Sequence, residues 1–464
     1  MKIKFPVLCL LAVIITSMLI SCGNNDENDV VTEKDEEQIE ITVGSWPSQE
    51  LNPTEYEVYE TYKKAFEEKY PEIKIKESEW EYTSDAYLPL AASGMLPTIY
   101  SVPYTESAKI INSGYARDVT DICKEYNVDK GMNEFALSVA EKDGAFYGVP
   151  YFGYVMGMTY NAKLFIDAGL VDEEGRPTYP KTWEQVASMG QIIKEKTGAY
   201  GFSFDTKNGK DAFQFLALAN AYGVEFEKKD KNDKWNVAFN SPEMIEAVQF
   251  LSDLKWKYDI IPSDFSLDTD ELFGTGQLAM REGIGAGSTP ELQSYGISKD
   301  NIGCGPVPSG PYGRFPQYGG EVYMFSLNST NAEIEAAFKW LDFIGDIVNA
   351  PENYEENLRF DLQSKLDKGY GIDKEYFILR SEGEKNEIKT RVYEEMKNVN
   401  SLYATSLITD GVKMTLEPPV CTYQLYEAIS GLIQTVLNDS NADIPSLIKD
   451  CAENFQQDYL DNAE

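Results

Sequence analysis

The stretch that decides the fold begins with Glu40-Ile41-Thr42-Val43-Gly44, continues through residues 55–70 and ends with Ile73-Lys74-Ile75. The first and last runs are rich in β-branched residues, which predicts two buried strands. Between them, Pro71 ends a helix whose apolar face consists of aromatic residues spaced three and four apart: Tyr59, Tyr62, Phe66 and Tyr70. A strand, a helix and a strand in succession indicate an α/β fold, with mainly parallel sheets flanked by helices.

The same local signals recur along the chain. Thr182 with Gln185 three residues later forms a capping box that predicts a helix start. Ser241-Pro242 predicts a second start, because serine caps a helix and proline suits its first position. Apolar residues at helical spacing predict two further helices near the end of the chain: Leu425, Ile429, Leu432 and Val436 in one, and Leu447, Cys451 and Phe455 in the other.

Composition excludes several classes of function. The chain has 464 residues, a formal net charge of −36 and no histidine. That length is typical of two or three globular units. The strong negative charge repels nucleic acids, whose binding depends on lysine and arginine, and the absence of imidazole excludes a Ser-His-Asp triad or histidine ligands to zinc. The 30 tyrosines suit a surface that binds half-polar ligands.

The first residues predict export. Lys2 and Lys4 precede an apolar run over residues 5–20, and residues 1–21 have the form of a signal peptide. Leu19-Ile20-Ser21-Cys22 resembles a bacterial lipobox, which would make Cys22 the lipidated, palmitate-bearing N-terminus. A plain signal peptide or an uncleaved anchor helix are the alternatives. The polar, acidic residues 22–39 are expected to form a disordered tether.

The remaining cysteines are scattered along the chain and form no C-x-x-C pair, so neither a zinc site nor a thioredoxin-like motif is expected. Their pairing stays open, with free thiols as the default: Cys123, Cys304, Cys421 and Cys451. No cofactor or metal is expected, and phosphate-binding, serine-hydrolase and metalloprotease motifs were not found in the sequence.

Several blocks of sequence form a recognisable series. The most specific is Asp143-Gly-x-x-Tyr-Gly-Val-Pro150, followed by Tyr160-Asn-x-x-x-Phe165 and Thr182-Trp183-Glu184. Together with other blocks, these resemble motifs of the family 1 extracellular solute-binding proteins, the maltose-binding-protein-like receptors of ABC importers. Thr98 departs from the family's usual Pro-Asp ending. The further blocks are residues 91–98, 114–121, 168–170, 273–280 and 303–308.

The resemblance implies a two-lobed, periplasmic-binding-protein-like fold of type II, with a hinge between the lobes. By this analogy lobe 1 comprises residues 40–152 plus 305–347, and lobe 2 comprises residues 153–304 plus 348–464. Solute would be captured between the lobes, because loops at the carboxyl ends of parallel strands line such a cleft. Closure about the hinge would be the signal that a transporter reads.

The resemblance also implies a function. It predicts a monomeric receptor that catalyses no reaction, binds a carbohydrate, in particular an oligosaccharide, and delivers it to ABC permease subunits. The protein would be exported and held by its lipid at the outer face of the bacterial cytoplasmic membrane, or in a periplasm. Nucleic acid is not an expected partner.

Sugars combine apolar ring faces with hydroxyl groups, so their sites pair aromatic platforms with carboxylates, amides and arginine. Trp46 follows the first strand, where a cleft loop begins, and is expected to be a platform; a core tryptophan is the alternative. Another group follows the second strand in the same topological position, with a solvated loop as its alternative: Trp80, Glu81, Tyr82 and Asp85.

Further candidates come from later segments. Tyr151 and Tyr154 lie at the first expected hinge crossing, and Tyr104 follows a strand over residues 99–102. Arg281 takes a loop position that the family places against solute, although the tryptophan that many relatives carry there is missing. The last candidates are Glu321, after the pair Gly319-Gly320, and Tyr423, near the last long helix; Phe213 and Gln214 are expected to be core residues.

Two other functions stay open. The first is a carboxylate-dependent glycoside hydrolase or lyase at the cell surface, which needs two acids facing each other across the site. The second keeps the receptor but changes its cargo to a polyamine or another cation, which so acidic a chain would attract. Aromatic residues with several cleft carboxylates and no arginine would support the cationic cargo, and Arg281 in the cleft would oppose it.

Overall fold

The computed structural model describes residues 38–206, 210–264, 267–283, 290–373, 379, 383–400, 415 and 417–462. The predicted signal peptide, Cys22 and most of the tether lie outside the described residues. Within the described part of the chain, every helix is too short or too polar to cross a membrane.

The first lobe is built on a five-stranded sheet in which β13 runs antiparallel to both of its neighbours. Strands β1, β2 and β3 pair in parallel, as the strand–helix–strand pattern predicts. The sheet order is β2 (Ile73–Glu77), β1 (Ile39–Val43), β3 (Ile99–Pro103), β13 (Tyr318–Phe325) and β6 (Gly148–Val155).

Helices cover this sheet and bury an aromatic core. Phe66, from the predicted aromatic helix face, packs edge-on against Trp340 at 5.3 Å between ring centroids. The bounds of this lobe's elements are α1 (Pro53–Lys69), α2 (Ser84–Ser93), α3 (Tyr104–Asn112), α4 (Thr120–Glu125), α5 (Val128–Gly131), α6 (Glu134–Leu137), α13 (Asn331–Ile344), and the short pair β4 (Glu141–Lys142) and β5 (Ala145–Phe146).

The second lobe has a four-stranded sheet in which β7 runs antiparallel to both of its neighbours. Its order is β12 (Ile302–Pro306), β7 (Gly157–Asn161), β11 (Leu278–Gly283) and β8 (Tyr200–Phe202). Around it lie α7 (Ala162–Asp167), α8 (Trp183–Thr197), α9 (Lys210–Ala221), α10 (Pro242–Trp256), α11 (Thr269–Gly274), α12 (Pro290–Ser294), α16 (Thr422–Asn438), α17 (Ile444–Asp458), the hairpin β9 (Glu227–Lys229) and β10 (Trp235–Val237), and the 3-10 turns η2 (Lys299–Asn301) and η3 (Leu460–Asn462).

The predicted helix starts are confirmed. The Thr182 hydroxyl accepts a hydrogen bond from the backbone N–H of Gln185 and caps α8, and Ser241 accepts one from Met244 and caps α10. In α16 the predicted apolar stripe is buried: Leu425, Ile429, Leu432 and Val436. The α/β fold class is confirmed in both lobes.

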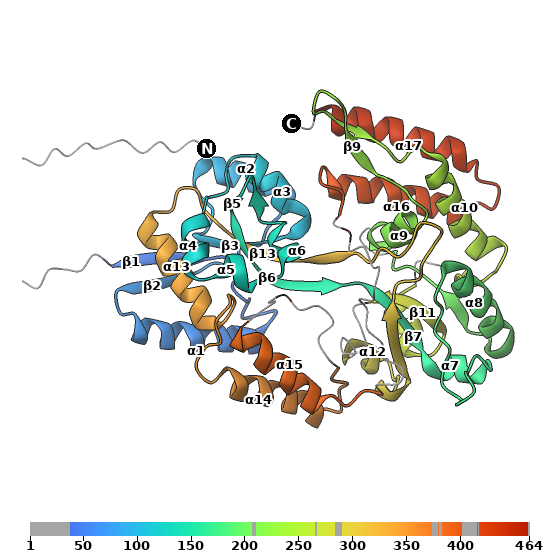
Figure 1. Cartoon of the computed structure of the whole chain (residues 1–464), viewed down its shortest axis with the longest axis horizontal. Helices are drawn as coiled ribbons and strands as arrows, with labels where there is room; N and C mark the ends of the chain where they lie inside the picture. The colour runs from blue at the N-terminus through green and yellow to red at the C-terminus, as the bar shows by residue number, and fades with distance from the viewer. Residues whose placement is uncertain are drawn as a thin grey trace, which may run out of the picture. The chain divides into compact units, whose positions relative to one another are not determined.

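The chain crosses between the sheets at two neighbouring places. Strand β6 ends at Val155 and β7 begins at Gly157, so a single residue, Met156, separates them. The return crossing lies between β12 and β13, and the Met156 N–H donates to the Gln317 carbonyl at 2.9 Å. Figure 1 shows β6 and β13 side by side between the helices of the two lobes. The boundaries of the two lobes at residue level stay a prediction.

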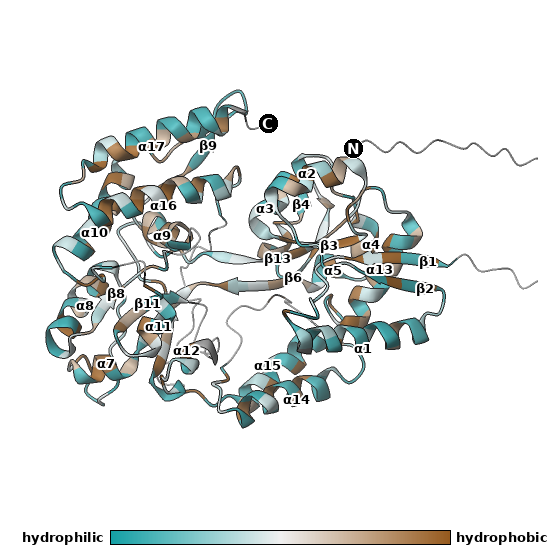
Figure 2. Ribbon diagram, turned by 180° about the vertical axis from the view of Figure 1, so that it is seen from behind, coloured by the Kyte–Doolittle hydropathy of each residue, from teal (hydrophilic) through white to brown (hydrophobic). Residues whose placement is uncertain are grey.

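A small helical unit follows α13, consisting of α14 (Tyr354–Asp367) and α15 (Glu384–Met396). Its ribbon is mostly hydrophilic (Figure 2), and it has a small hydrophobic cluster of its own, formed by Leu362, Ile372 and Val392. We call this the α14–α15 unit.

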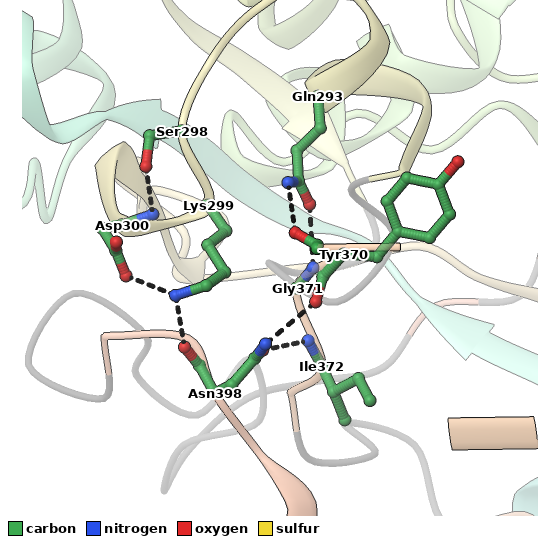
Figure 3. Close-up of polar contacts among 9 residues, drawn as sticks. Gln293, Ser298, Lys299, Asp300, Tyr370, Gly371, Ile372 and Asn398 are labelled. Carbon is green, nitrogen blue, oxygen red and sulfur yellow. Dashed lines mark hydrogen bonds and ion pairs between the residues drawn. The ribbon is translucent and has the colours of Figure 1, made fainter. Parts of the chain in front are cut away.

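Polar contacts attach the α14–α15 unit to the second lobe (Figure 3). The Gln293 amide group donates to the Gly369 carbonyl at 3.0 Å and accepts from the Gly371 N–H at 2.8 Å. Lys299 donates to the Asn398 carbonyl at 2.9 Å. On the other side, the Asn133 N–H of the first lobe donates to the carbonyl of residue 379 at 2.7 Å. This part of the chain therefore contacts both lobes.

Of the cysteines in the described residues, none forms a disulfide. Cys123 and Cys304 are buried, whereas Cys421 and Cys451 are half-buried. Burial raises the pKa of the Cys451 thiol to about 11, which keeps it protonated and unreactive near neutral pH.

Candidate functional site

A cavity of about 690 Å³ lies between elements of the two lobes. The first lobe contributes the carboxyl end of β3 and parts of β6 and β13, and the second contributes α9 and α16. The lining residues are Pro103, Thr105, Tyr154, Lys210, Phe213, Gly319, Gly320, Glu417, Tyr423, Tyr426, Glu427, Ser430, Gly431 and Gln434. We call this cavity the cleft; its volume is typical of small-molecule sites.

Tyr154 and Tyr423 bring aromatic rings to the cleft from opposite lobes. Tyr423 lies in the first turn of α16 and is 41% exposed. Burial, followed by the charge of Glu417, raises the pKa of Tyr154 to about 12. Burial, followed by the charge of Glu106, raises the pKa of Tyr423 to about 12. Both phenols therefore stay neutral and can donate a hydrogen bond to solute at physiological pH.

The glycine pair before Glu321 lines the cleft and is closely packed on its other sides. Gly319 pairs with Tyr154 across the sheet, and a Cβ atom on it would lie 2.4 Å from the Tyr154 hydroxyl oxygen. A Cβ on Gly320 would lie 2.2 Å from the Phe152 carbonyl oxygen and 2.7 Å from the Tyr104 ring. These glycines are needed because aromatic rings and backbone lie directly against the strand.

Glu321 belongs to a compact polar group beside the cleft. Ser101 Oγ donates to the Glu321 carboxylate at 2.9 Å, and the Tyr151 hydroxyl also donates to it. The Tyr151 ring stacks on Tyr323, with centroids 3.9 Å apart and an interplanar angle of 18°. One face of the Tyr151 ring is therefore already covered by protein.

Glu106 is a buried acid that sequence reasoning missed. It is 3% exposed, accepts a hydrogen bond from Tyr82, and forms an ion pair with Lys109 at 3.4 Å. Its charge acts on Tyr423 as well as on Tyr82. Nothing in the local sequence distinguishes Glu106 from the exposed acids of other helix starts.

Glu417 is the second missed residue, and it connects the lobes. The hydroxyls of Thr105, at the start of α3, and Tyr426, in α16, both donate to its carboxylate. Burial raises the pKa of Glu417 against the opposite effect of these two hydrogen bonds. The only sequence signal was the Glu417-Pro418-Pro419 run ahead of a long helix.

The structure places two expected site residues in the interior of the first lobe. Trp46 is 3% exposed, stacks on Trp340 with centroids 5.9 Å apart and meets Tyr59 edge-on at 5.2 Å. Its expected platform role is therefore corrected to a core role, since the indole is enclosed by other rings. Tyr104 is 5% exposed and packs at 5.4 Å from Tyr318, so its expected contact with solute is corrected in the same way.

Arg281 also lies elsewhere. It extends from β11 and forms an ion pair with Asp270 at 2.6 Å, with its side chain 15% exposed. It is not among the residues that line the cleft. The expectation that Arg281 faces solute is corrected, because its charge is already neutralised within the second lobe.

The four candidates that follow β2 lie in different surroundings. Trp80 is half-buried and packs edge-on against Tyr100 at 5.8 Å, whereas Glu81 and Asp85 are exposed and do not line the cleft. Tyr82 lies in the electrostatic neighbourhood of Tyr423.

Of the residues predicted for the site, Tyr154 and Tyr423 line the cleft, and three more lie near them: Tyr82, Tyr151 and Glu321. Phe213, which was expected to be core, lines the cleft. Gln214 is buried, as expected, and accepts from the Asp205 N–H at 2.8 Å.

Two α/β lobes with a cleft between them define the class of periplasmic-binding-protein-like receptors. The family described as bacterial extracellular solute-binding proteins matches residues 51–346, which is more than half of the chain. The chain belongs to this family. Because the family consists of binding proteins, the expectation that the chain is not an enzyme is confirmed.

Curated relatives are similar over part of their length. The glycerol-3-phosphate-binding protein UgpB of Yersinia pseudotuberculosis is 24% identical over 52% of this chain and 54% of its own length, so the chain spans about half of that relative. The maltodextrin-binding protein MdxE of Bacillus subtilis is 23% identical over 65% of this chain and 70% of its own. The diacetylchitobiose-binding protein DasA of Streptomyces coelicolor is 23% identical over 70% and 76%.

Solved structures share the fold. Maltose-bound MalE3 of T. maritima has a TM-score of 0.62 at 20% identity and covers 90% of this chain and 99% of its own. UgpB of Mycobacterium tuberculosis, in complex with glycerophosphocholine, has a TM-score of 0.61 at 15% identity, with coverage of 90% and 98%. At these identities the likeness establishes the two-lobed architecture.

Proposed function

We propose that this protein is a receptor that captures a carbohydrate, in particular an oligosaccharide, between its two lobes and delivers it to an ABC importer. The observation that carries the proposal is the cleft itself, where Tyr154 and Phe213 lie beside the Glu417 carboxylate. Aromatic rings pack on the apolar faces of sugar rings, and carboxylates accept hydrogen bonds from sugar hydroxyls. The names of MdxE and DasA, which bind a maltodextrin and diacetylchitobiose, support this class of cargo.

Binding would be coupled to closure about the hinge. Tyr154 belongs to the first lobe and Tyr423 to the second, so a solute that contacts both rings stabilises the arrangement in which the lobes approach. The adjacent crossings at Met156 and Gln317 are the natural place for the backbone rotation. Tyr82, Tyr151 and Glu321 would complete the site.

Attachment to the cell is a further part of the proposal. The lipobox-like sequence supports export, cleavage before Cys22 and lipidation, including palmitate, at that residue. The tether would then hold a monomeric receptor at the outer face of the membrane, next to its permease. Intact-mass measurement of the protein from its native membrane tests this step, because a mass without acyl chains would contradict it.

A thermal-shift screen against a panel of neutral oligosaccharides tests the cargo. A ligand that binds only the folded state stabilises it and so raises the melting temperature. At a ligand concentration of a hundred times Kd, the free energy of unfolding rises by about 2.7 kcal/mol. Tyr423→Ala should abolish the shift with little change in the melting temperature of the free protein, because Tyr423 is 41% exposed. Tyr459→Ala, on a residue 37% exposed beyond the cleft, is the matched control. No shift with any glycan would contradict the carbohydrate proposal.

A cationic solute such as a polyamine is a second candidate, since the cleft has carboxylates and no arginine among its lining residues. Spermidine in the same screen tests it directly. The hydrolase alternative is not supported, because the family consists of binding proteins. Intact glycan after prolonged incubation is the expected control result.

A further inference from the structure

The lysines and the carboxylates near the cleft differ in whether the protein supplies a partner of opposite charge. Lys109 is paired with Glu106 at 3.4 Å, and Lys210 with Asp205 at 3.3 Å. Both lysines therefore already have an acidic partner on the protein. Among the described residues near the cleft, these pairs leave no concentrated positive charge for a phosphate or a carboxylate of the solute.

Glu417 has a different environment. Its two hydrogen-bond donors are the neutral hydroxyls of Thr105 and Tyr426. Among the described residues, the charged group that perturbs its pKa is another acid, Glu106. Glu321 is similar, since its donors are the hydroxyls of Ser101 and Tyr151. Among the described residues, neither acid forms an ion pair with lysine or arginine.

Both acids retain capacity for a further partner. An ionised carboxylate has about four acceptor positions, and Glu417 and Glu321 each use two for the donors described above. A buried charge without a counter-ion is costly, so an ammonium group supplied by the ligand would be favourable there. Burial raises the pKa of Glu417, which is the effect expected where a counter-charge is missing.

The two acids act on the same part of the cleft. Glu417 and Glu321 both perturb Tyr154, in the first lobe, and Tyr423, in the second. A cation placed near these phenols would therefore feel both carboxylates. Tyrosine faces also attract cations directly, which adds to the effect.

We propose that the carbohydrate bound by this cleft carries a primary amino group, and that its ammonium ion lies beside Glu417, within reach of the field of Glu321. This inference rests on the proposed function and specifies the chemical class of its cargo. It unites the aromatic platforms, which suit sugar rings, with the uncompensated acids, which suit a cation. Phosphorylated sugars fit this site less well, because the described lysines near the cleft, Lys109 and Lys210, each already have an acidic partner.

Isothermal titration calorimetry tests the inference with three oligosaccharides of equal length and spermidine. The oligosaccharides are glucosamine trimer, its N-acetylated form and maltotriose, titrated at a pH where the free amines are protonated. We expect glucosamine trimer to bind at least about tenfold more tightly than the acetylated trimer, which corresponds to about 1.4 kcal/mol. The preference should shrink at high salt, because screening weakens charge attraction.

Two isosteric variants locate the effect. Glu417→Gln keeps the shape and an accepting oxygen of the side chain but removes its charge, so it should lower the affinity for glucosamine trimer about tenfold more than it lowers the affinity for maltotriose. Glu321→Gln should act in the same direction. Glu453→Gln, on the exposed face of α17, is the matched control and should change neither affinity.

The outcomes are distinguishable. Equal or tighter binding of the acetylated trimer or maltotriose would overturn the inference and leave the proposed function standing. Binding of spermidine alone, or of none of the sugars, would overturn both. An unchanged preference in both glutamine variants would also overturn the inference, since another feature would then select the amine.

Discussion

At Trp46, what covers the two faces of the indole decides whether the ring is a binding surface or part of the core. Trp340 stacks on it and Tyr59 meets it edge-on. Trp46→Ala would therefore leave a large cavity and should lower the free energy of unfolding by about 3–5 kcal/mol.

Urea denaturation measures this loss, with Phe360→Ala, on a residue 78% exposed, as the control. Glycan affinity of the fraction that folds should be unchanged. A variant with full stability but weakened binding would restore Trp46 to the site.

Because the Glu227 carboxyl is buried, we expect the free energy of unfolding to depend on pH. Glu227 is 8% exposed, and burial raises its pKa from the ordinary value of 4.5 to about 7, against a hydrogen bond from the Val420 N–H. Between these two pH values the folded state binds more protons than the unfolded state. Stability should therefore fall as the pH rises from about 4.5 to 7, by on the order of 3 kcal/mol, and stay low above 7.

Glu227→Gln removes the cost of ionising this buried carboxyl. The variant should therefore have a higher melting temperature than the wild type at pH 8 and no higher melting temperature at pH 4.5. Glu225→Gln, two residues away and exposed, is the control. Melting curves at several pH values check the sign. A Glu227→Gln variant that is less stable at pH 8 would contradict the assignment.

At the scale of elements, Asn398 fixes the geometry of the α14–α15 unit. Its side chain donates to the Tyr370 carbonyl at 2.9 Å and accepts from the Ile372 N–H at 2.6 Å (Figure 3). The small apolar cluster of this unit provides little other stabilisation. Asn398→Ala should lower the local stability by about 1–3 kcal/mol, because buried backbone groups lose their partners.

Hydrogen exchange measures that effect residue by residue. Exchange in α14 and α15 should accelerate about tenfold or more, while α8 and α10 stay protected. Asn349→Ala, which removes an exposed hydrogen bond to Asp342, is the matched control. Uniform acceleration in all helices would show that this unit unfolds only with the whole protein.

At the scale of the whole molecule, solute should change the separation of the lobes. The cleft is lined from both sides, so bound solute gains most contacts when the lobes close on it. Small-angle X-ray scattering should show a smaller radius of gyration at saturating glycan than without it. Tyr423→Ala at the same glycan concentration should keep the larger value, and an unchanged radius with bound solute would contradict closure.

Much of the fold could be predicted because its signals are local. The strands around Ile41 and Ile75, the aromatic face of α1 and the caps at Thr182 and Ser241 each depend on neighbours a few residues away. The site was predicted less well. Tyr154 and Tyr423 were found from their positions relative to strand and helix ends, but the same logic misplaced Trp46, Tyr104 and Arg281.

The sequence by itself determined an α/β chain and membership in a solute-binding family, because periodicity, caps and motif order are written along the chain. Only the tertiary structure decided which rings and acids meet at the cleft. Thr105 and Glu417 are 312 positions apart, yet they share a hydrogen bond there. Burial and charge compensation arise from such long-range packing, and local sequence does not encode which side of a ring the core covers.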